Sequence, residues 1–102
     1  MEDIEDIKVD ELRQRQKAME TLNIIDVREV WEHQEYNIGG LNIPLGTVPT
    51  RLGELESMKE QEIIVYCRTG NRSGKIKKFL QQQGFSKVRN LLGGVEEFQL
   101  EQ

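Results

Sequence analysis

Cys67 is the only cysteine of the 102-residue chain, and it lies where an apolar strand meets a polar loop. The strand is the β-branched run 63–66, which is typical of a strand covered on both faces, and helical spacing begins near residue 73. Unpaired backbone N–H groups at a helix start, together with the helix dipole, favour a bound anion. We therefore expect the loop after Cys67 to be an anion cradle around a thiol. Its residues are Arg68, Thr69, Gly70, Asn71, Arg72 and Ser73.

Basic residues gather around this loop. Residues 67–78 contain five cations and no acid, although the whole chain has a net charge of −4. Arg72 lies at the start of the predicted helix, where the macrodipole repels a cation. A side chain that breaks a local rule beside a cleft is a candidate for function, so we expect Arg72 to face the bound anion. The cations Lys75, Lys77 and Lys78 are expected to form a solvated helix face, with docking of an acidic partner as the alternative.

The other elements alternate between strands and helices, and they must bring supporting residues to the loop. The predicted strands are 22–27, 41–44, 63–66 and 88–92. The predicted helices are 10–18 with Asp10 as its cap, 29–36, 49–57, 72–83 and 95–100. This alternation implies right-handed crossovers and a mainly parallel sheet with helices on both faces. Asp26 and Arg28 then emerge beside Cys67 at the carboxyl edge of the sheet.

The composition limits what the site can be. Residues 1–102 contain no linker and are expected to form one domain. With one cysteine and one histidine the chain has no internal disulfide and no ordinary zinc site, so we expect no metal. No apolar stretch approaches the ~20 residues that span a membrane, the amino terminus is acidic rather than a secretory signal, and the negative net charge disfavours nucleic acid. We therefore expect a cytoplasmic protein without membrane or nucleic-acid partners.

Four segments resemble the rhodanese domains, in the order and spacing of that family. They are Ile25-Asp26-Val27-Arg28-Glu29, residues 38–45, Val65-Tyr66-Cys67-Arg68-Thr69-Gly70-Asn71-Arg72-Ser73 and Asn90-Leu91-Leu92-Gly93-Gly94-Val95. The resemblance implies an α/β fold with a mainly parallel, five-stranded sheet flanked by helices. It also implies that Cys67 carries the transferred sulfur, that residues 68–72 cradle its persulfide, and that Arg72 closes the loop while Arg68 lies at its rim. Asp26 and Arg28 would support the loop from the neighbouring strand end.

Two positions depart from the family pattern. The usual His-Ile-Pro-Gly-Ala turn is replaced by residues 37–41, and the tryptophan that is common in the closing helix is replaced near Phe98. Trp31 and Phe98 are expected to be packing residues, and His33 is expected to have a surface or capping role away from the loop. For Asp26 two roles stay open, which are hydrogen bonding to the neighbouring loop backbone and orientation of Arg72.

The resemblance implies thiosulfate sulfurtransferase activity, and the residues indicate how it would proceed. A cysteine thiol has a pKa of ~8.5, which adjacent arginines and a helix amino terminus lower. We expect a Cys67 thiolate to attack the outer sulfur of thiosulfate or of a persulfide donor, release sulfite and hold the sulfur as a persulfide. A thiol or cyanide then accepts that sulfur. We expect no cofactor, because the transferred sulfur is held covalently as the cysteine persulfide.

Three alternatives stay open. A cysteine phosphatase or arsenate reductase also uses a thiolate, a backbone cradle and an arginine, but such phosphatases need a longer loop than the four residues that separate Cys67 from Arg72. A non-catalytic interaction module is the second, although such modules usually lack the cysteine. The third is a sulfur relay that docks to a biosynthetic partner protein and supplies sulfur for tRNA, thiamine or molybdopterin.

Overall fold

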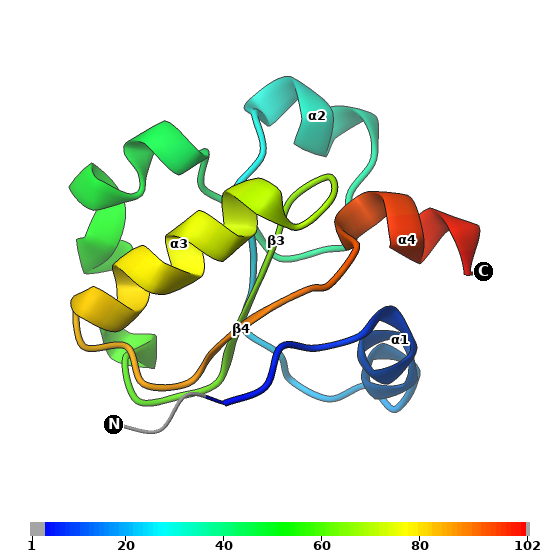
Figure 1. Ribbon diagram of the computed structural model, residues 1–102, viewed down its shortest axis with the longest axis horizontal. Helices are drawn as coiled ribbons and strands as arrows, with labels where there is room; N and C mark the ends of the chain where they lie inside the picture. The colour runs from blue at the N-terminus through cyan, green and yellow to red at the C-terminus, as the bar shows by residue number, and fades with distance from the viewer. Residues whose placement is uncertain (1–3, 102) are drawn as a thin grey trace.

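The computed structural model describes residues 4–101 and shows a parallel sheet between layers of helices (Figure 1). The strand order is β2-β1-β3-β4, and every neighbouring pair is parallel. The strands are β1 (Ile24–Asp26), β2 (Leu41–Asn42), β3 (Ile63–Tyr66) and β4 (Val88–Asn90). Parallel neighbours need crossover connections, which the helical segments supply. The predicted α/β fold with a parallel sheet is confirmed.

The sheet has four strands within residues 4–101, so the expectation of five strands was wrong. In place of a fifth strand there is one isolated parallel bridge, between Ile7 and Leu91. Ile7 donates its N–H to the Asn90 carbonyl at 3.0 Å and accepts the Leu92 N–H at 2.9 Å. Helix α1 (Val9–Lys17) begins two residues after Ile7. The extended segment therefore ends before a second residue can pair with the segment that follows β4.

The two faces of the sheet are covered by different helices (Figure 1). One face packs beneath α3 (Asn71–Gln82) and the 3-10 helices η1 (Leu45–Thr47) and η2 (Pro49–Met58), and the other packs against α1 and α4 (Gly94–Leu100). Side chains of β3 alternate between the two cores: Ile63 and Val65 enter the first, and Ile64 and Tyr66 enter the second. All four are therefore buried, as the unbroken apolar run predicted.

Two helix predictions were wrong in detail. The residue that precedes α1 is Lys8, so Asp10 is not the cap but lies in the first turn, where a carboxylate still interacts favourably with the helix dipole. The segment predicted as an α-helix at 49–57 forms the 3-10 helix η2, and Arg51 within it has non-helical angles of φ −111° and ψ 15°. None of the helices in residues 4–101 is both long and apolar enough to cross a membrane.

Two side chains, Trp31 and Lys77, pack differently from what the sequence predicted. Phe98 is 7 % exposed and packs in the core as predicted, but Trp31 is 62 % exposed, so its prediction as a packing residue was wrong. Lys77 does not belong to a solvated face, because its Nζ lies 2.6 Å from the Asp6 carboxylate and its side chain is 12 % exposed. The lysines on either side of it, at positions 75 and 78, are exposed as predicted.

Candidate active site

The register of β1 and β3 places the two predicted parts of the site at one edge of the sheet. Asp26 pairs with Tyr66, so Cys67 follows directly at the same level. The Val27 N–H donates to the Tyr66 carbonyl at 3.0 Å and continues the pairing beyond the strand ends. Asp26, Arg28 and Cys67 thus emerge together at the carboxyl edge, as the predicted order of elements required.

The Cys67 sulfur is surrounded by donors from the loop and the first turn of α3. It accepts the Gly70 N–H at 3.1 Å and the Ser73 N–H at 3.4 Å, and the Ser73 hydroxyl lies 3.3 Å from it. Gly70 has a φ of +105°, which glycine adopts without strain, and this turn directs its N–H toward the sulfur. Cys67 is 1 % exposed and Ser73 is fully buried. The sulfur therefore lies inside a cradle of protein donors.

These donors favour the ionised sulfur. Burial raises the pKa of the Cys67 thiol, but hydrogen bonds from the Ser73 hydroxyl and from the N–H groups of Ser73, Gly70 and Thr69 outweigh burial and leave the pKa below its ordinary value. The sulfur also lies at the amino end of α3, whose first residue is Asn71. The thiolate is thus stabilised mainly by N–H and O–H groups.

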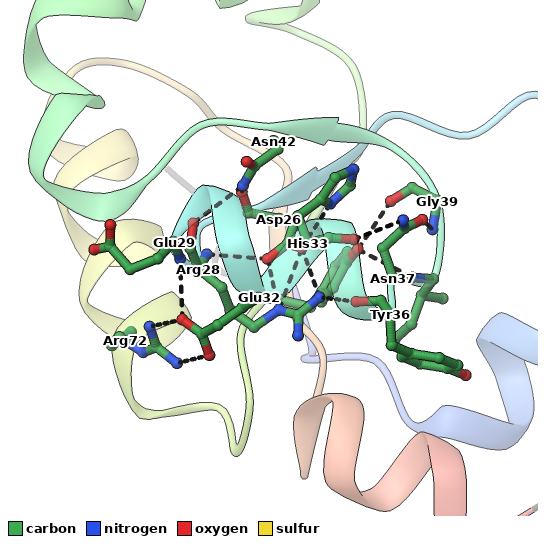
Figure 2. Close-up of polar contacts among 12 residues, drawn as sticks. Asp26, Arg28, Glu29, Glu32, His33, Tyr36, Asn37, Gly39, Asn42 and Arg72 are labelled. Atoms are coloured by element: carbon green, nitrogen blue, oxygen red, sulfur yellow. Dashed lines mark hydrogen bonds and ion pairs between the residues drawn. The ribbon is translucent and has the colours of Figure 1, made fainter.

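The Arg72 side chain is tied to a carboxylate instead of lying free in the loop. Its two terminal nitrogens donate to Glu32 of α2 (Val30–Glu35) at 2.9 and 3.0 Å, as Figure 2 shows. Glu32 also accepts the backbone N–H of Glu29 at 3.0 Å, which completes a capping box. The hydrogen bond from Arg72 lowers the pKa of Glu32 to about 2, although burial acts in the opposite direction.

Arg68 is paired in the same way. Its Nε lies 2.9 Å from the Glu96 carboxylate of α4, and both side chains are more than half exposed. Arg68 is thus at the rim of the loop, as the resemblance implied. Neither this arginine nor Arg72 is the free cation that the charge pattern of residues 67–78 suggested.

Asp26 and Arg28 form a buried pair next to α2 (Figure 2). Arg28 donates to both carboxylate oxygens of Asp26 at 2.8 to 3.2 Å, and its backbone N–H donates to the same carboxylate at 3.0 Å. His33 Nδ1 lies 2.8 Å from Asp26, so the expectation that His33 has only a surface or capping role was wrong. Asp26 therefore bonds to its own strand end and to α2, and Arg28 reaches the Tyr36 carbonyl at 2.6 Å.

Two residues of this site were not predicted from the sequence: Glu32, described above, and Asn90 at the end of β4. The Ser73 hydroxyl also lies within hydrogen-bond distance of Asn90 Oδ1, at 2.6 Å, and Asn90 Nδ2 donates to the Gly70 carbonyl at 3.0 Å. The rule that selected Asp26 applies equally to Asn90, because β4 is next to β3 and ends at the same edge. No comparable pattern distinguishes Glu32 from the neighbouring acids of its helix.

The start of α4 supports the loop from the other side. The Val95 N–H donates to the Cys67 carbonyl at 2.9 Å, and the Glu96 N–H donates to the Arg68 carbonyl at 3.0 Å. Gly94 has a φ of +59°, and a Cβ at this position would collide with the Cys67 carbonyl oxygen. The close approach of two backbones thus requires glycine at position 94.

An open cleft of about 380 Å³ lies beside the loop, between α2 and α4. Its walls include Trp31, Glu32, Arg68 and Glu96, whereas Cys67 does not line it. Within residues 4–101 no group of three or more His, Cys, Asp or Glu side chains is arranged to hold a metal ion. The arrangement offers a stabilised thiolate and a neighbouring space.

Comparison with known proteins identifies relatives over most of the chain. YrkF of Bacillus subtilis (strain 168), which bears a provisional sulfur-carrier name, is 36 % identical over 96 residues. The match covers 93 % of this chain but 51 % of YrkF, so the chain spans about half of that protein. The thiosulfate sulfurtransferase PspE of Escherichia coli (strain K12) is 35 % identical over 74 residues, which cover 72 % of this chain and 70 % of PspE.

Solved structures and a family match agree with these relatives. The crystal structure of a rhodanese-like domain protein from Staphylococcus aureus superimposes with a TM-score of 0.83 at 27 % identity and covers 93 % of this chain and 91 % of its own. The sequence model of the rhodanese-like domain matches residues 8–101. The chain therefore belongs to the rhodanese-like domain family.

Proposed function

We propose that this protein is a sulfurtransferase in which Cys67 takes a sulfane sulfur from thiosulfate or a persulfide donor and passes it to a nucleophilic acceptor. The observation that supports this proposal most is the set of donors from Gly70 and Ser73 on the Cys67 sulfur. They stabilise a thiolate, which is the form of cysteine that attacks. The thiosulfate sulfurtransferase PspE and the sulfur-carrier name of YrkF support the same chemistry.

In the first half-reaction the Cys67 thiolate attacks the outer sulfur of thiosulfate. A sulfur–sulfur bond to Cys67 forms as the sulfur–sulfur bond of thiosulfate breaks, and sulfite leaves with the electron pair. In the second half-reaction cyanide takes the outer sulfur as thiocyanate, or a thiolate takes it as a new persulfide, and the Cys67 thiolate returns. Neither step transfers a proton, so the site needs no general base beside the cysteine.

The remaining N–H groups of residues 68–72 are proposed to hold the outer sulfur of the persulfide. Arg72 uses two of the five N–H donors of its guanidinium for Glu32, and three remain for an anionic donor. Arg68 lies at the rim, where a donor or acceptor would pass. Asp26 and Arg28 support this arrangement indirectly, because they fix the end of β1 and the helix that carries Glu32.

A sulfur relay to a partner protein is the second candidate. The sulfur-carrier name of YrkF and the cleft between α2 and α4 beside the loop favour it. In that case a protein persulfide or thiol replaces thiosulfate and cyanide, and the chemistry at Cys67 is unchanged. The cytoplasmic location stays a prediction.

Mass spectrometry of the intact protein tests the proposal. After treatment with thiosulfate or with a low-molecular-weight persulfide, the wild-type protein is expected to gain one sulfur atom, and cyanide is expected to remove it with release of thiocyanate. The Cys67→Ser variant should gain no sulfur. Loading by the persulfide but not by thiosulfate would favour the relay. If neither donor loads the wild-type protein, the transferase proposal is wrong.

A further inference from the structure

The Ser73 hydroxyl has two partners and one proton to give. Its oxygen lies 2.6 Å from Asn90 Oδ1 and 3.3 Å from the Cys67 sulfur. A hydroxyl donates one hydrogen bond at a time, so it cannot donate to both acceptors. Ser73 is fully buried and Asn90 is 7 % exposed, so water is a poor substitute for either bond.

The orientation of the Asn90 amide is set by its second bond. Its Nδ2 donates to the Gly70 carbonyl, which can only accept, at 3.0 Å. The oxygen Oδ1 therefore has to face Ser73, where it needs a donor. The Asn90 backbone is held as well, because its N–H donates to the Asp6 carboxylate at 2.9 Å.

The protonation state of the sulfur decides between the two arrangements. A Cys67 thiol has its own hydrogen and can donate to the Ser73 oxygen, so the hydroxyl remains on Asn90 Oδ1. A thiolate is only an acceptor and carries a full charge, and a hydrogen bond to a charged acceptor is stronger than one to a neutral amide. The hydroxyl then turns toward the sulfur and leaves Asn90 Oδ1 without its donor.

We propose that Ser73 is a donor that changes partner during the reaction and that Asn90 is the positioning residue that holds it whenever the sulfur of Cys67 is uncharged. The proposal rests on the proposed function in one respect, namely that Cys67 is the nucleophile. In the persulfide the inner sulfur has no charge, so Ser73 returns to Asn90. When the outer sulfur leaves, charge develops again on the Cys67 sulfur, and Ser73 donates to it.

The competition has a consequence that can be measured. Asn90 Oδ1 withholds the Ser73 proton from the thiolate, so loss of this oxygen should stabilise the thiolate. Loss of Nδ2 acts in the opposite direction, because Gly70 then loses a bond that holds its N–H toward the sulfur. Only the first effect depends on Ser73, so a double-mutant cycle separates them.

The charged groups around the sulfur remain in place in such a cycle. They come from the N-terminal segment, the end of β1, the loop and the three helices packed against it, and they are Asp6, Asp26, Arg28, Glu32, His33, Arg68, Arg72, Lys77 and Glu96. Because they are common to all four proteins, a difference between the serine and alanine backgrounds reports the Ser73 proton.

The experiment measures the rate of Cys67 alkylation by iodoacetamide as a function of pH, in the wild type, Asn90→Ala, Ser73→Ala and the double variant. Ser73→Ala is expected to raise the pKa of Cys67. Asn90→Ala should shift the pKa of Cys67 downward in the wild-type background relative to its shift in the Ser73→Ala background. The expected difference between the two shifts is about half a pH unit, equivalent to about a threefold difference in the thiolate-to-thiol ratio. Equal changes in both backgrounds would overturn the proposal.

Asn90→Asp takes the place of Asn90→Ala in the double-mutant cycle if Asn90→Ala does not fold. A carboxylate keeps an acceptor for Ser73 and adds negative charge, so the pKa of Cys67 should rise, and it should rise more in the wild-type background than in the Ser73→Ala background. A lower pKa, or a rise that is the same in both backgrounds, would contradict the proposal. Alkylation needs no sulfur donor, so this outcome is independent of whether thiosulfate loads Cys67.

Discussion

The ion pair between Arg72 and Glu32 connects the Cys67 loop to α2, and Glu32→Gln tests what this pair contributes to the folded state. Glutamine keeps the oxygen that accepts the Glu29 N–H, so the capping box survives, whereas the charge and the second hydrogen bond from Arg72 are lost. We expect the variant to fold and to be less stable than the wild type at neutral pH.

The magnitude follows from the pKa of Glu32. Its value falls from 4.5 to about 2 on folding, chiefly through the hydrogen bond from Arg72. That difference corresponds to at most about 3 kcal/mol of folding free energy. Because the Arg72 side chain is 36 % exposed, solvent screens the pair and we expect about 1.5 kcal/mol.

The pH dependence has a definite sign. The folded-state pKa lies below the unfolded one, so the stabilisation is present above pH 4.5 and is lost as the pH falls toward about 2. Wild type and Glu32→Gln should therefore differ by about 1.5 kcal/mol at pH 7, and less than half of that difference should remain at pH 3.

Urea denaturation at pH 7, 4 and 3 measures this difference. Glu35→Gln is the matched control, because Glu35 is an exposed acid on the same helix. The control should stay within about 0.5 kcal/mol of the wild type at every pH. A loss of stability in Glu32→Gln that does not change between pH 7 and pH 3 would refute the assignment to an ion pair.

Two further substitutions probe the core and the support of the loop. Leu80→Ala should destabilise the protein by about 3 kcal/mol in urea denaturation because Leu80 is fully buried, whereas Leu100→Ala, at an 80 % exposed position, should change stability by less than about 0.5 kcal/mol. Gly94→Ala should displace the Cys67 carbonyl, cost at least about 1 kcal/mol and slow alkylation of Cys67, whereas Gly53→Ala meets no neighbour within 4 Å and should do neither. Normal alkylation in Gly94→Ala would mean that α4 does not set the loop geometry.

The fold could be predicted where one pattern decides the element. The unbroken apolar run of β3 is buried on both faces because its alternate side chains enter two separate cores. Segment 49–58 has no such pattern: Pro49 suits the first turn of several helix types, and nothing in the sequence pattern marks the departure of Arg51 from helical angles. The prediction of a fifth strand was wrong because the pairing at Ile7 ends where α1 begins.

At the site, strand-end position was a better guide than charge. Asp26, Arg28 and Cys67 were placed correctly by the order of the strands, and Asn90 obeys the same rule. The excess of cations in residues 67–78 suggested a free positive field, but charge counted along a sequence does not show which acids fold back onto it. Glu32 and Glu96 come from segments about 30 to 40 residues away and pair with the two arginines of the loop.

This pairing changes the physical account of the nucleophile. If free arginines stabilised the thiolate, salt would screen them and reactivity would depend strongly on ionic strength. With Arg68 and Arg72 already paired, the stabilisation falls to the N–H groups of the loop and to Ser73, which are buried, short-range and directional. Such hydrogen bonds act on the sulfur itself and discriminate little between sulfur donors of different charge. A dianionic sulfur donor is therefore expected to be favoured less by the Cys67 loop than the sequence suggests, and a neutral persulfide is expected to be disfavoured little.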